Sequence, residues 1–306
     1  IGPRGIGCFI AGESAALGAD FGAFLQSQAE LAARADFDTA FPSRETRRVA
    51  VVKTTPVATV PEDMVAIPAA ELTLEVVFRV RECGFYESSS QPLAGGNLHK
   101  PVLFQRQVKL ERFAIDLTPV TNAQFAEFLR AGGYRPKHPE NFLKHWSHGR
   151  PPAGLEDHPV VYVDPGDARA YAAWAGKRLP TEDEWQFAAQ GREGYLYPWG
   201  NEMRPGRFNG GETGGTTPVT AFPEGRSPFG CYDLCGNTWE WTESEHRDGR
   251  THFAILKGGA YYAARGSDWY FDGGPQTNRF AAKFLLHWPG IDRCATIGFR
   301  CVKDLE

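Results

Sequence analysis

The sequence has no long run of apolar residues and no signal-like leader at its start. A bilayer-spanning helix needs roughly 20 consecutive apolar residues, so the sequence predicts no membrane span. Long basic runs are also absent, and the 33 lysines and arginines are outnumbered by 37 aspartates and glutamates. Nucleic-acid-binding proteins carry a basic surface, so this balance argues against a nucleic-acid partner.

Fixed-spacing metal motifs are absent as well: the sequence has neither twin C-x-x-C pairs nor an H-E-x-x-H segment. Four of the eight histidines lie between Tyr134 and Pro159, where proline and glycine interrupt the chain. We interpret this segment as a surface loop bordering a cleft rather than as a metal site. The spacing of the six cysteines selects no disulfide pairing, and buried free thiols are the simplest interpretation. They are Cys8, Cys83, Cys231, Cys235, Cys294 and Cys301.

Glycine and proline are abundant, at 34 and 22 residues, and aromatic residues make up 13% of the 306 residues. This composition predicts a loop-rich domain whose core is held by buried rings. Residues 1–60 differ from the rest and predict one strand, a helix from about Asp20 to Arg34 with Asp20 as its cap, and an extended linker. We expect this extension to be the tail of a preceding domain, because the chain begins at Ile1 without Met, and residues 61–306 to be the main domain.

Local signals in the main domain predict several elements. Apolar alternation predicts strand structure over 64–86, broken by Pro68, and a single strand over 102–116. Three helices have start signals: Thr121 with Gln124, Asp164 before Pro165, and Thr181 with Glu184. The helices are expected to end at glycines: Gly132 and Gly133 for the first, Gly176 for the second and Gly191 for the third. The expected core rings of the last two helices are Trp174, Trp185 and Phe187.

The most informative stretch is FGCYDLCGNTWEWTES, residues 229–244. Turn residues inside an aromatic run indicate a deliberately bent backbone. Asp233, Thr238 and Glu240 bring oxygen donors close together, as a hard cation such as calcium requires. The alternative is a solvated acidic loop on a core anchored by tryptophan.

Six blocks in this order resemble the formylglycine-generating enzyme, or sulfatase-modifying factor, family. They are LTPVTNAQFAEFL, GKRLPTEDEWQFAA, YPWGNE, GNTWEW, LKGGAYY and IGFRCV. The resemblance covers about four fifths of the chain and implies an α+β, irregular, loop-rich fold related to C-type lectins. It also favours an extracytoplasmic or secreted location. Because the family includes copper oxidases, halves of iron-dependent sulfur-transfer enzymes and proteins without known chemistry, the resemblance alone does not imply an activity.

The resemblance implies a structural calcium site. Asp233, Gly236, Thr238 and Glu240 match the family's ligand positions, with glycine and threonine acting through their backbone carbonyls. Asn209 matches one ligand of a second, weaker site, whose acidic partner segment is shortened here to GGETGGTTP, with Glu212 as the substitute.

The sequence departs from the family at the copper site. In the oxidases two cysteines hold the metal, since cuprous ion prefers soft thiolates. Ala263 and Asp268 stand at those positions, and Ala260 replaces a nearby serine. Copper and formylglycine generation are therefore not expected. Two cysteines that the family uses for disulfides appear as Ala172 and Ala189, which leaves Cys301 without that partner.

The segment that replaces the copper site combines aromatic rings with charged and amide groups, which is typical of a site for a sugar or another small polar ligand. The alternative is that the rings anchor loops and the charges are solvated. The candidate ligand-binding residues are Arg265, Asp268, Trp269, Tyr270, Asn278, His287 and Trp288.

Three functional interpretations follow. The first is a binding module for a glycan, a peptide or a partner protein. The second is an enzyme with different chemistry, using Asp268 and His287 as acid and base or a metal at the histidine-rich loop. The third is a structural or accessory domain that associates with other domains of a longer chain.

Overall fold

The computed structural model describes residues 18–33, 47–79, 100–247, 251–263, 273–286 and 292–306. Contacts between residues divide the chain into two compact units, residues 1–43 and residues 44–306. Among the described residues, no helix combines the length and apolar character that a bilayer crossing requires.

The first unit contains helix α1 (Ala19–Ala32), close to the predicted range. The predicted cap is wrong, because Gly18 is the N-cap residue and no side chain caps the helix. Asp20 lies instead in the first turn, where a negative charge interacts favourably with the helix dipole. Phe24 and Leu25 are 54% and 52% exposed.

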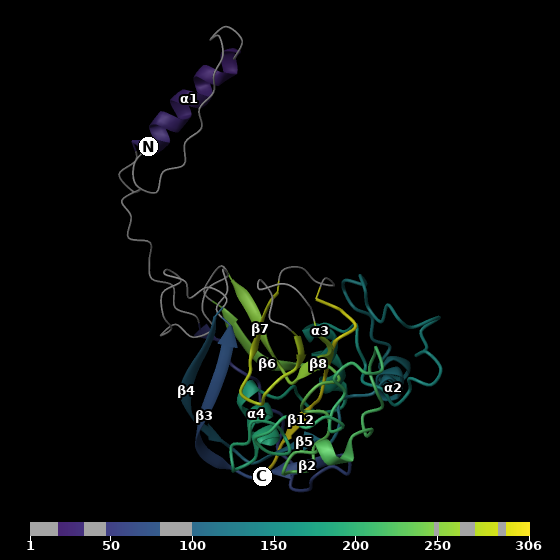
Figure 1. Ribbon diagram of the computed structural model, residues 1–306. Helices are drawn as coiled ribbons and strands as arrows, with labels where there is room; N and C mark the ends of the chain where they lie inside the picture. Colours follow the sequence, from purple (N-terminus) through teal and green to yellow (C-terminus); the bar gives the residue numbers. More distant parts are fainter. Residues whose placement is uncertain (1–17, 34–46, 80–99, 248–250, 264–272, 287–291) are drawn as a thin grey trace. The chain divides into compact units, whose positions relative to one another are not determined.

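The second unit is built around a five-stranded sheet with the strand order β1-β6-β7-β10, in which β11 pairs with β6 (Figure 1). The β6–β11 pair is parallel and the other pairs are antiparallel. The parallel pair places Ile297–Phe299 beside Trp239–Trp241 of the tryptophan-rich stretch found in the sequence. The strands are β1 (Arg47–Arg48), β6 (Trp239–Arg247), β7 (His252–Lys257), β10 (Ala282–Leu285) and β11 (Ile297–Phe299).

A second sheet places β5 (Phe113–Asp116) between β2 (Met64–Ile67) and β12 (Val302–Asp304). Two ribbons accompany it: β3 (Ala70–Arg79) with β4 (Pro101–Leu110), and β8 (Gly259–Ala263) with β9 (Gly273–Pro275). Pro68 separates β2 from β3, as predicted.

The single strand predicted over 102–116 is wrong, because the chain changes partners after Leu110. β4 pairs with β3 along its whole length, whereas β5 pairs with β2 and β12. Uninterrupted alternation in the sequence cannot reveal such a change of sheet.

The three predicted helices of the main domain are present as α2 (Asn122–Gly132), α3 (Pro165–Trp174) and α4 (Glu182–Gln190). Thr121 and Thr181 form the predicted capping boxes, and Asp164 forms a third with Asp167. One short 3-10 helix, η3 (Pro223–Gly225), lies in the loops. The remaining described residues between α4 and β6 have neither helix nor strand structure, so the unit is an α+β fold rich in loops.

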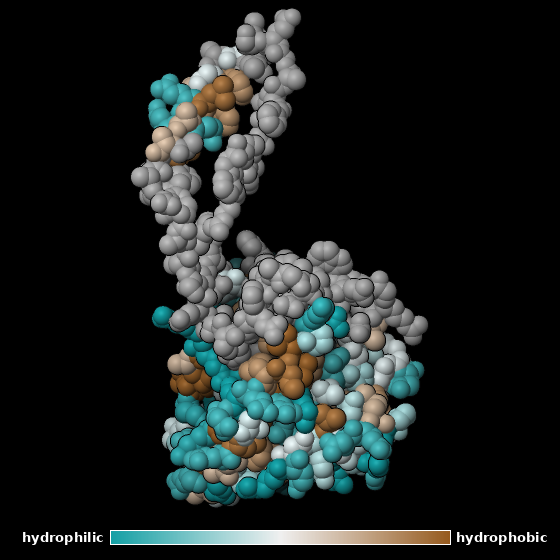
Figure 2. All heavy atoms as spheres, turned by 60° about the vertical axis from the view of Figure 1, so that its left-hand side comes forward, coloured by the Kyte–Doolittle hydropathy of each residue, from teal (hydrophilic) through white to brown (hydrophobic). Residues whose placement is uncertain are grey.

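Aromatic rings hold the core together, as the composition predicts. Phe125 of α2 stacks on Tyr171 of α3 at 5.8 Å between ring centroids, and Phe299 meets both rings edge to face. Trp185 and Phe187 are buried on α4, but Trp174 is 42% exposed, so its assignment to the core is wrong. On the face that Figure 2 shows, apolar atoms form separate areas within a mostly hydrophilic surface.

Candidate functional site

The strand β8 carries two of the three positions at which the sequence departs from the copper enzymes. Ala260 is fully buried in the aromatic core, and Ala263 is exposed at the strand's end, opposite Gly273 of β9. An alanine methyl group has no lone pair for a metal. Within the described ranges, no three His, Cys, Asp or Glu side chains gather in a way that could hold a metal ion.

The described cysteines are free thiols: Cys231, Cys235, Cys294 and Cys301. Three of them are buried, and Cys301 lies in the same core cluster as Ala172. Burial raises the pKa of Cys231 to about 11, so this thiol stays protonated and unreactive near neutral pH. Within the part of the chain that the structure describes, Ala260 and Ala263 therefore supply no thiolate to a cuprous ion.

Six of the seven predicted ligand residues lie outside the described ranges: Arg265, Asp268, Trp269, Tyr270, His287 and Trp288. The seventh, Asn278, is fully buried. Its side-chain amide donates to the backbone carbonyl of Tyr195 at 2.9 Å. The backbone carbonyl of Asn278 accepts from the side-chain nitrogen of Lys257 at 2.9 Å. In this arrangement Asn278 joins the loop around Tyr195 to the end of β7.

Glu240, a predicted calcium ligand, lies in the middle of the core with Arg300. Both side chains are completely buried, and Nε and Nη2 of Arg300 donate to the two carboxylate oxygens at 2.7 Å each. The indole Nε1 of Trp185 donates to the same carboxylate at 2.7 Å. This fork geometry satisfies the carboxylate and fixes β6 against the chain's end.

Asp233 and Asn237 bend the backbone next to this pair, and both have positive φ angles, of 54° and 59°. Asn237 donates from its side chain to Asp233 at 3.0 Å and from its backbone to the carbonyl of Asn209 at 3.1 Å. Burial raises the pKa of Asp233 to about 7, and the hydrogen bond from Asn237 and the charge of Arg300 offset this only in part. The Thr238 hydroxyl is buried without a partner among the described residues.

These donors fit a hard cation in chemistry and charge. Asp233 and Glu240 are both buried carboxylates beside the single positive charge of Arg300, and burial raises the pKa of Asp233, so a bound cation would compensate the charge that appears when Asp233 is ionised. Gly236 allows the close approach, because a Cβ there would lie 2.5 Å from the carbonyl oxygen of Asn209. A calcium ion at this point would be structural, because the side chains of Asp233 and Glu240 are buried.

The weaker site predicted around Asn209 is occupied by protein contacts. The Asn209 side chain donates to the carbonyl of Gly215 and accepts from the backbone of Gly211. Glu212 accepts from the backbone of Gly210 at 3.0 Å and is exposed. Both side chains therefore stabilise the loop itself.

The four histidines of the 134–159 segment have different surroundings, and His148 is exposed. His158 hydrogen-bonds Thr216 through Nδ1 at 3.0 Å. His145 packs against Tyr162 at 5.3 Å between ring centroids, and burial lowers its pKa to about 4. His138 lines a cavity at the start of α3.

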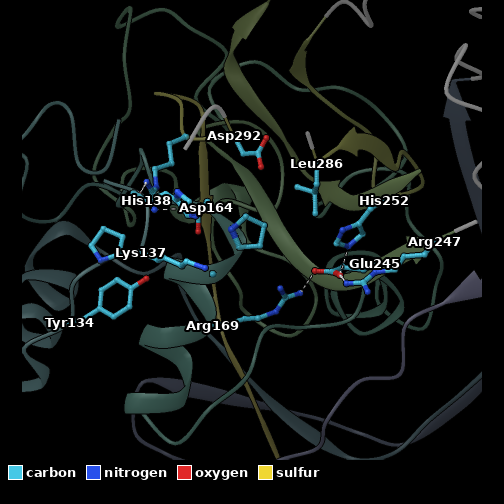
Figure 3. Close-up of a pocket in the computed structure, with 14 residues that line it drawn as sticks. Tyr134, Lys137, His138, Asp164, Arg169, Glu245, Arg247, His252, Leu286 and Asp292 are labelled. Atoms are coloured by element: carbon cyan, nitrogen blue, oxygen red, sulfur yellow. Dashed lines mark hydrogen bonds and ion pairs between the residues drawn. The ribbon is translucent and has the colours of Figure 1, made fainter. Parts of the chain in front are cut away.

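We call this last feature the α3 cavity, and Figure 3 shows it in close-up. Its volume is about 500 Å³, and it lies between the start of α3, the distal ends of β6 and β7, and the residues just before β11. The sequence analysis missed it, apart from the expectation of a cleft beside the histidine-rich loop. Its polar lining residues come from five separate segments: Tyr134, Lys137, His138, Asp164, Arg169, Glu245, Arg247, His252, Asp292 and Arg293.

Comparisons with known proteins agree on one family. Residues 48–305 match the model of the sulfatase-modifying factor enzyme 1-like domain. The chain is 38% identical to the inactive C-alpha-formylglycine-generating enzyme 2 of Bos taurus, over 51% of this chain and 67% of that protein. It is 32% identical to the formylglycine-generating enzyme of Streptomyces coelicolor, over 65% of this chain and 80% of that protein.

Bos taurus formylglycine-generating enzyme is 34% identical, and the match spans half of that protein's length and 45% of this chain. Among solved structures, PvdO from Pseudomonas aeruginosa superposes with a TM-score of 0.54 at 23% identity, covering 84% of this chain and all of that one. CarF superposes with a TM-score of 0.51 at 21% identity, covering 81% of this chain and all of that one. The two structures support the fold, and the family match over most of the chain supports the assignment: this chain belongs to the family of proteins with a sulfatase-modifying factor enzyme 1-like domain.

Proposed function

We propose that this chain is a family member that does not generate formylglycine and acts instead as a ligand-binding module for a glycan, a peptide or a partner protein. The observation that carries the proposal is the pair of alanines on β8, Ala260 and Ala263, at the positions of the serine and the first copper-binding cysteine. Retaining a scaffold while its site changes is a common route to a new role.

Two further findings support the loss of oxidase chemistry. Relatives from Bos taurus and Mus musculus that are 38% and 37% identical carry the word "inactive" in their names. The buried thiol of Cys231 is held protonated, as the raised pKa indicates, and alanine replaces the family's cysteine at position 172, beside Cys301 in the core.

The proposed ligand surface is the 260–290 region. Next to Ala263, the ring of Tyr262 is 61% exposed, which is unusual for so large an aromatic side chain. An exposed ring offers a face on which a sugar or a peptide side chain can stack. Leu286, at the other end of the region, borders the α3 cavity.

We also propose that Asp233, Glu240 and the carbonyls of Gly236 and Thr238 hold a structural calcium ion. The burial of two carboxylates beside a single arginine supports it, since a cation would favour the ionised form of Asp233. Calcium should raise the melting temperature of the EDTA-treated protein, and Asp233→Asn should reduce that increase. An unchanged melting temperature after chelation in calcium-free buffer would show that no ion is held.

The binding proposal is tested on glycan and peptide arrays with the purified chain. A specific ligand whose binding weakens several-fold in Tyr262→Ala supports it. Leu103→Ala is the matched control, since Leu103 is also large, apolar and 56% exposed, but lies on β4. Equal loss in both variants, or no ligand on either array, would favour the structural or accessory role instead.

The family resemblance and the calcium proposal both favour an extracytoplasmic location. The family resemblance is also compatible with association with other domains of a longer chain. Fractionation of the native host would test the location directly. Recovery with the cytosolic fraction would contradict it.

A further inference from the structure

The α3 cavity has two walls of opposite electrical character, and nothing in the proposed function uses them. In Figure 3, Arg169, Glu245, Arg247 and His252 lie together on one side, and Asp292 lies on the other. The cavity's volume of about 500 Å³ is in the range of small-molecule sites.

Glu245 lies at the centre of the first wall and is surrounded by basic side chains. That carboxylate is bound by Arg169 at 2.6 Å, by His252 at 2.5 Å and by Arg247 at 3.4 Å. Arg169 also binds Glu243 at 2.8 Å, which fixes its guanidinium at the edge of the cavity. Arg169 is therefore bound to two carboxylates, so it fixes this wall in place and leaves no free positive charge of its own.

Lys137 adds an exposed positive charge to this wall. It is exposed, and it makes no ion pair with any residue in the described ranges. In Figure 3 it extends from the side of Tyr134 toward Arg169. Its ammonium group is therefore available to a ligand at the cavity mouth.

The opposite wall presents a buried acid. Asp292 is only 7% exposed, and it accepts no hydrogen bond from the residues that the structure describes. Burial and the nearby charge of Asp164 raise its pKa to about 6, while Arg293 lowers it. A carboxylate in such a place is stabilised by a cationic partner.

The neighbouring Arg293 does not serve as that partner, because its own donors are used elsewhere. Its guanidinium binds Asp167 at 2.7 and 3.0 Å and Asp164 at 2.8 Å. Its Nη1 donates to the carbonyls of His138 and Glu140. Arg293 thus holds the start of α3 and leaves Asp292 directed toward the cavity.

We infer that the α3 cavity binds a small zwitterion, such as an amino acid. Asp292 receives its ammonium group, and Lys137 receives its carboxylate. Leu286 and Pro165 line the space between the walls and accommodate a hydrocarbon chain. This site goes beyond the proposed function, since none of its polar groups belongs to the residues on which that proposal rests.

Calorimetric titration of the whole chain tests this with four related probes. L-lysine and 6-aminohexanoate carry both charges, pentylamine carries only the ammonium group, and hexanoate only the carboxylate. We expect both zwitterions to bind more tightly than either singly charged probe. Binding of the amine or the acid alone as tightly as 6-aminohexanoate would overturn the two-wall arrangement, and no heat from any zwitterion at millimolar concentration would remove the site.

Two variants separate the walls. Asp292→Asn should weaken 6-aminohexanoate on the order of tenfold while leaving hexanoate unchanged, and Lys137→Gln should weaken both. Because Lys137 is exposed, its replacement tests the site even if the buried Asp292 variant fails to fold. Lys144→Gln, on the same loop but outside the cavity lining, is the matched control. Equal affinities in Lys137→Gln and Lys144→Gln would contradict the inference, whatever the outcome on the glycan arrays.

Discussion

Arg300 and Glu240 form a two-point ion pair in the fully buried centre of the second unit, with both nitrogen–oxygen distances at 2.7 Å. Arg300 also donates to the backbone carbonyls of Asp116 and Tyr232. One guanidinium therefore ties the chain's last strands to β5 and to the bend before β6.

Removing one partner of this pair should be severe. Glu240→Gln removes the carboxylate to which the buried guanidinium of Arg300 is hydrogen-bonded at two points, so we expect the free energy of unfolding to fall by about 3 to 5 kcal/mol. Urea unfolding followed by tryptophan fluorescence measures it. The double variant Glu240→Leu with Arg300→Met removes both charges and should recover part of the loss. A loss below about 1 kcal/mol in the single variant would mean that the pair matters little to stability.

Lys257 should make stability depend on pH. Its amine is fully buried and donates to neutral oxygens of Gln186 and Asn278, and burial lowers its pKa to about 7. Between that pH and the ordinary value of 10.5, the unfolded chain holds a proton that the folded chain has released. The stability that this group contributes therefore rises with pH across that window, by up to about 1.4 kcal/mol per pH unit.

Lys257→Met abolishes this proton linkage. The difference in unfolding free energy between the natural chain and this variant should increase as the pH rises above 7. Lys109→Met, at a largely exposed lysine, is the control and should give a flat difference. A flat difference for Lys257→Met as well would show that the buried amine keeps its proton.

Gly236 should be required for the stability of the fold, for two separable reasons. Its φ angle is +82°, and a Cβ would meet the carbonyl oxygen of Asn209 at 2.5 Å. Gly214 has a similar φ of +69° but open space around it. We expect Gly236→Ala to cost about 2 kcal/mol more than Gly214→Ala in urea unfolding, since only the first adds a steric clash to the backbone strain. Equal costs would mean that the bend relaxes.

The capping box of α2 should contribute measurably. Thr121 accepts from the backbone of Gln124 at 3.2 Å, and the Gln124 side chain accepts from the backbone of Thr121 at 2.9 Å. Thr121→Ala should lower the free energy of unfolding by about 1 kcal/mol. The exposed Thr59→Ala is the control, and an equal effect in both would argue against the cap.

The sequence predicts local features of this fold well. The capping boxes at Thr121 and Thr181 are confirmed, because each depends on residues three apart in the chain. The burial of Trp185 is confirmed, but the burial of every residue of α4, its acidic first turn included, is not visible in the sequence. The change of sheet between β4 and β5 is not visible in the sequence, since alternation continues while the partner strand changes.

The same distinction between local and long-range features applies to the candidate sites. Asp233 and Glu240 lie seven residues apart, so the sequence can predict that they are close, yet the buried partner of Glu240 is Arg300, sixty residues away. The α3 cavity brings Lys137 and Asp292 together from opposite ends of the domain. Isolated charged residues give no signal of this kind, because most such residues are solvated.

The central claim is that the chain retains the family's scaffold but lacks the thiolates that bind the metal. The most direct test is to incubate the purified chain with cuprous ion, oxygen and a cysteine-containing peptide, and to follow the peptide by mass spectrometry. We predict that the cysteine remains intact and that copper is lost on desalting. Conversion of the peptide cysteine to an aldehyde, or one copper retained per chain through thiolates, would contradict the account.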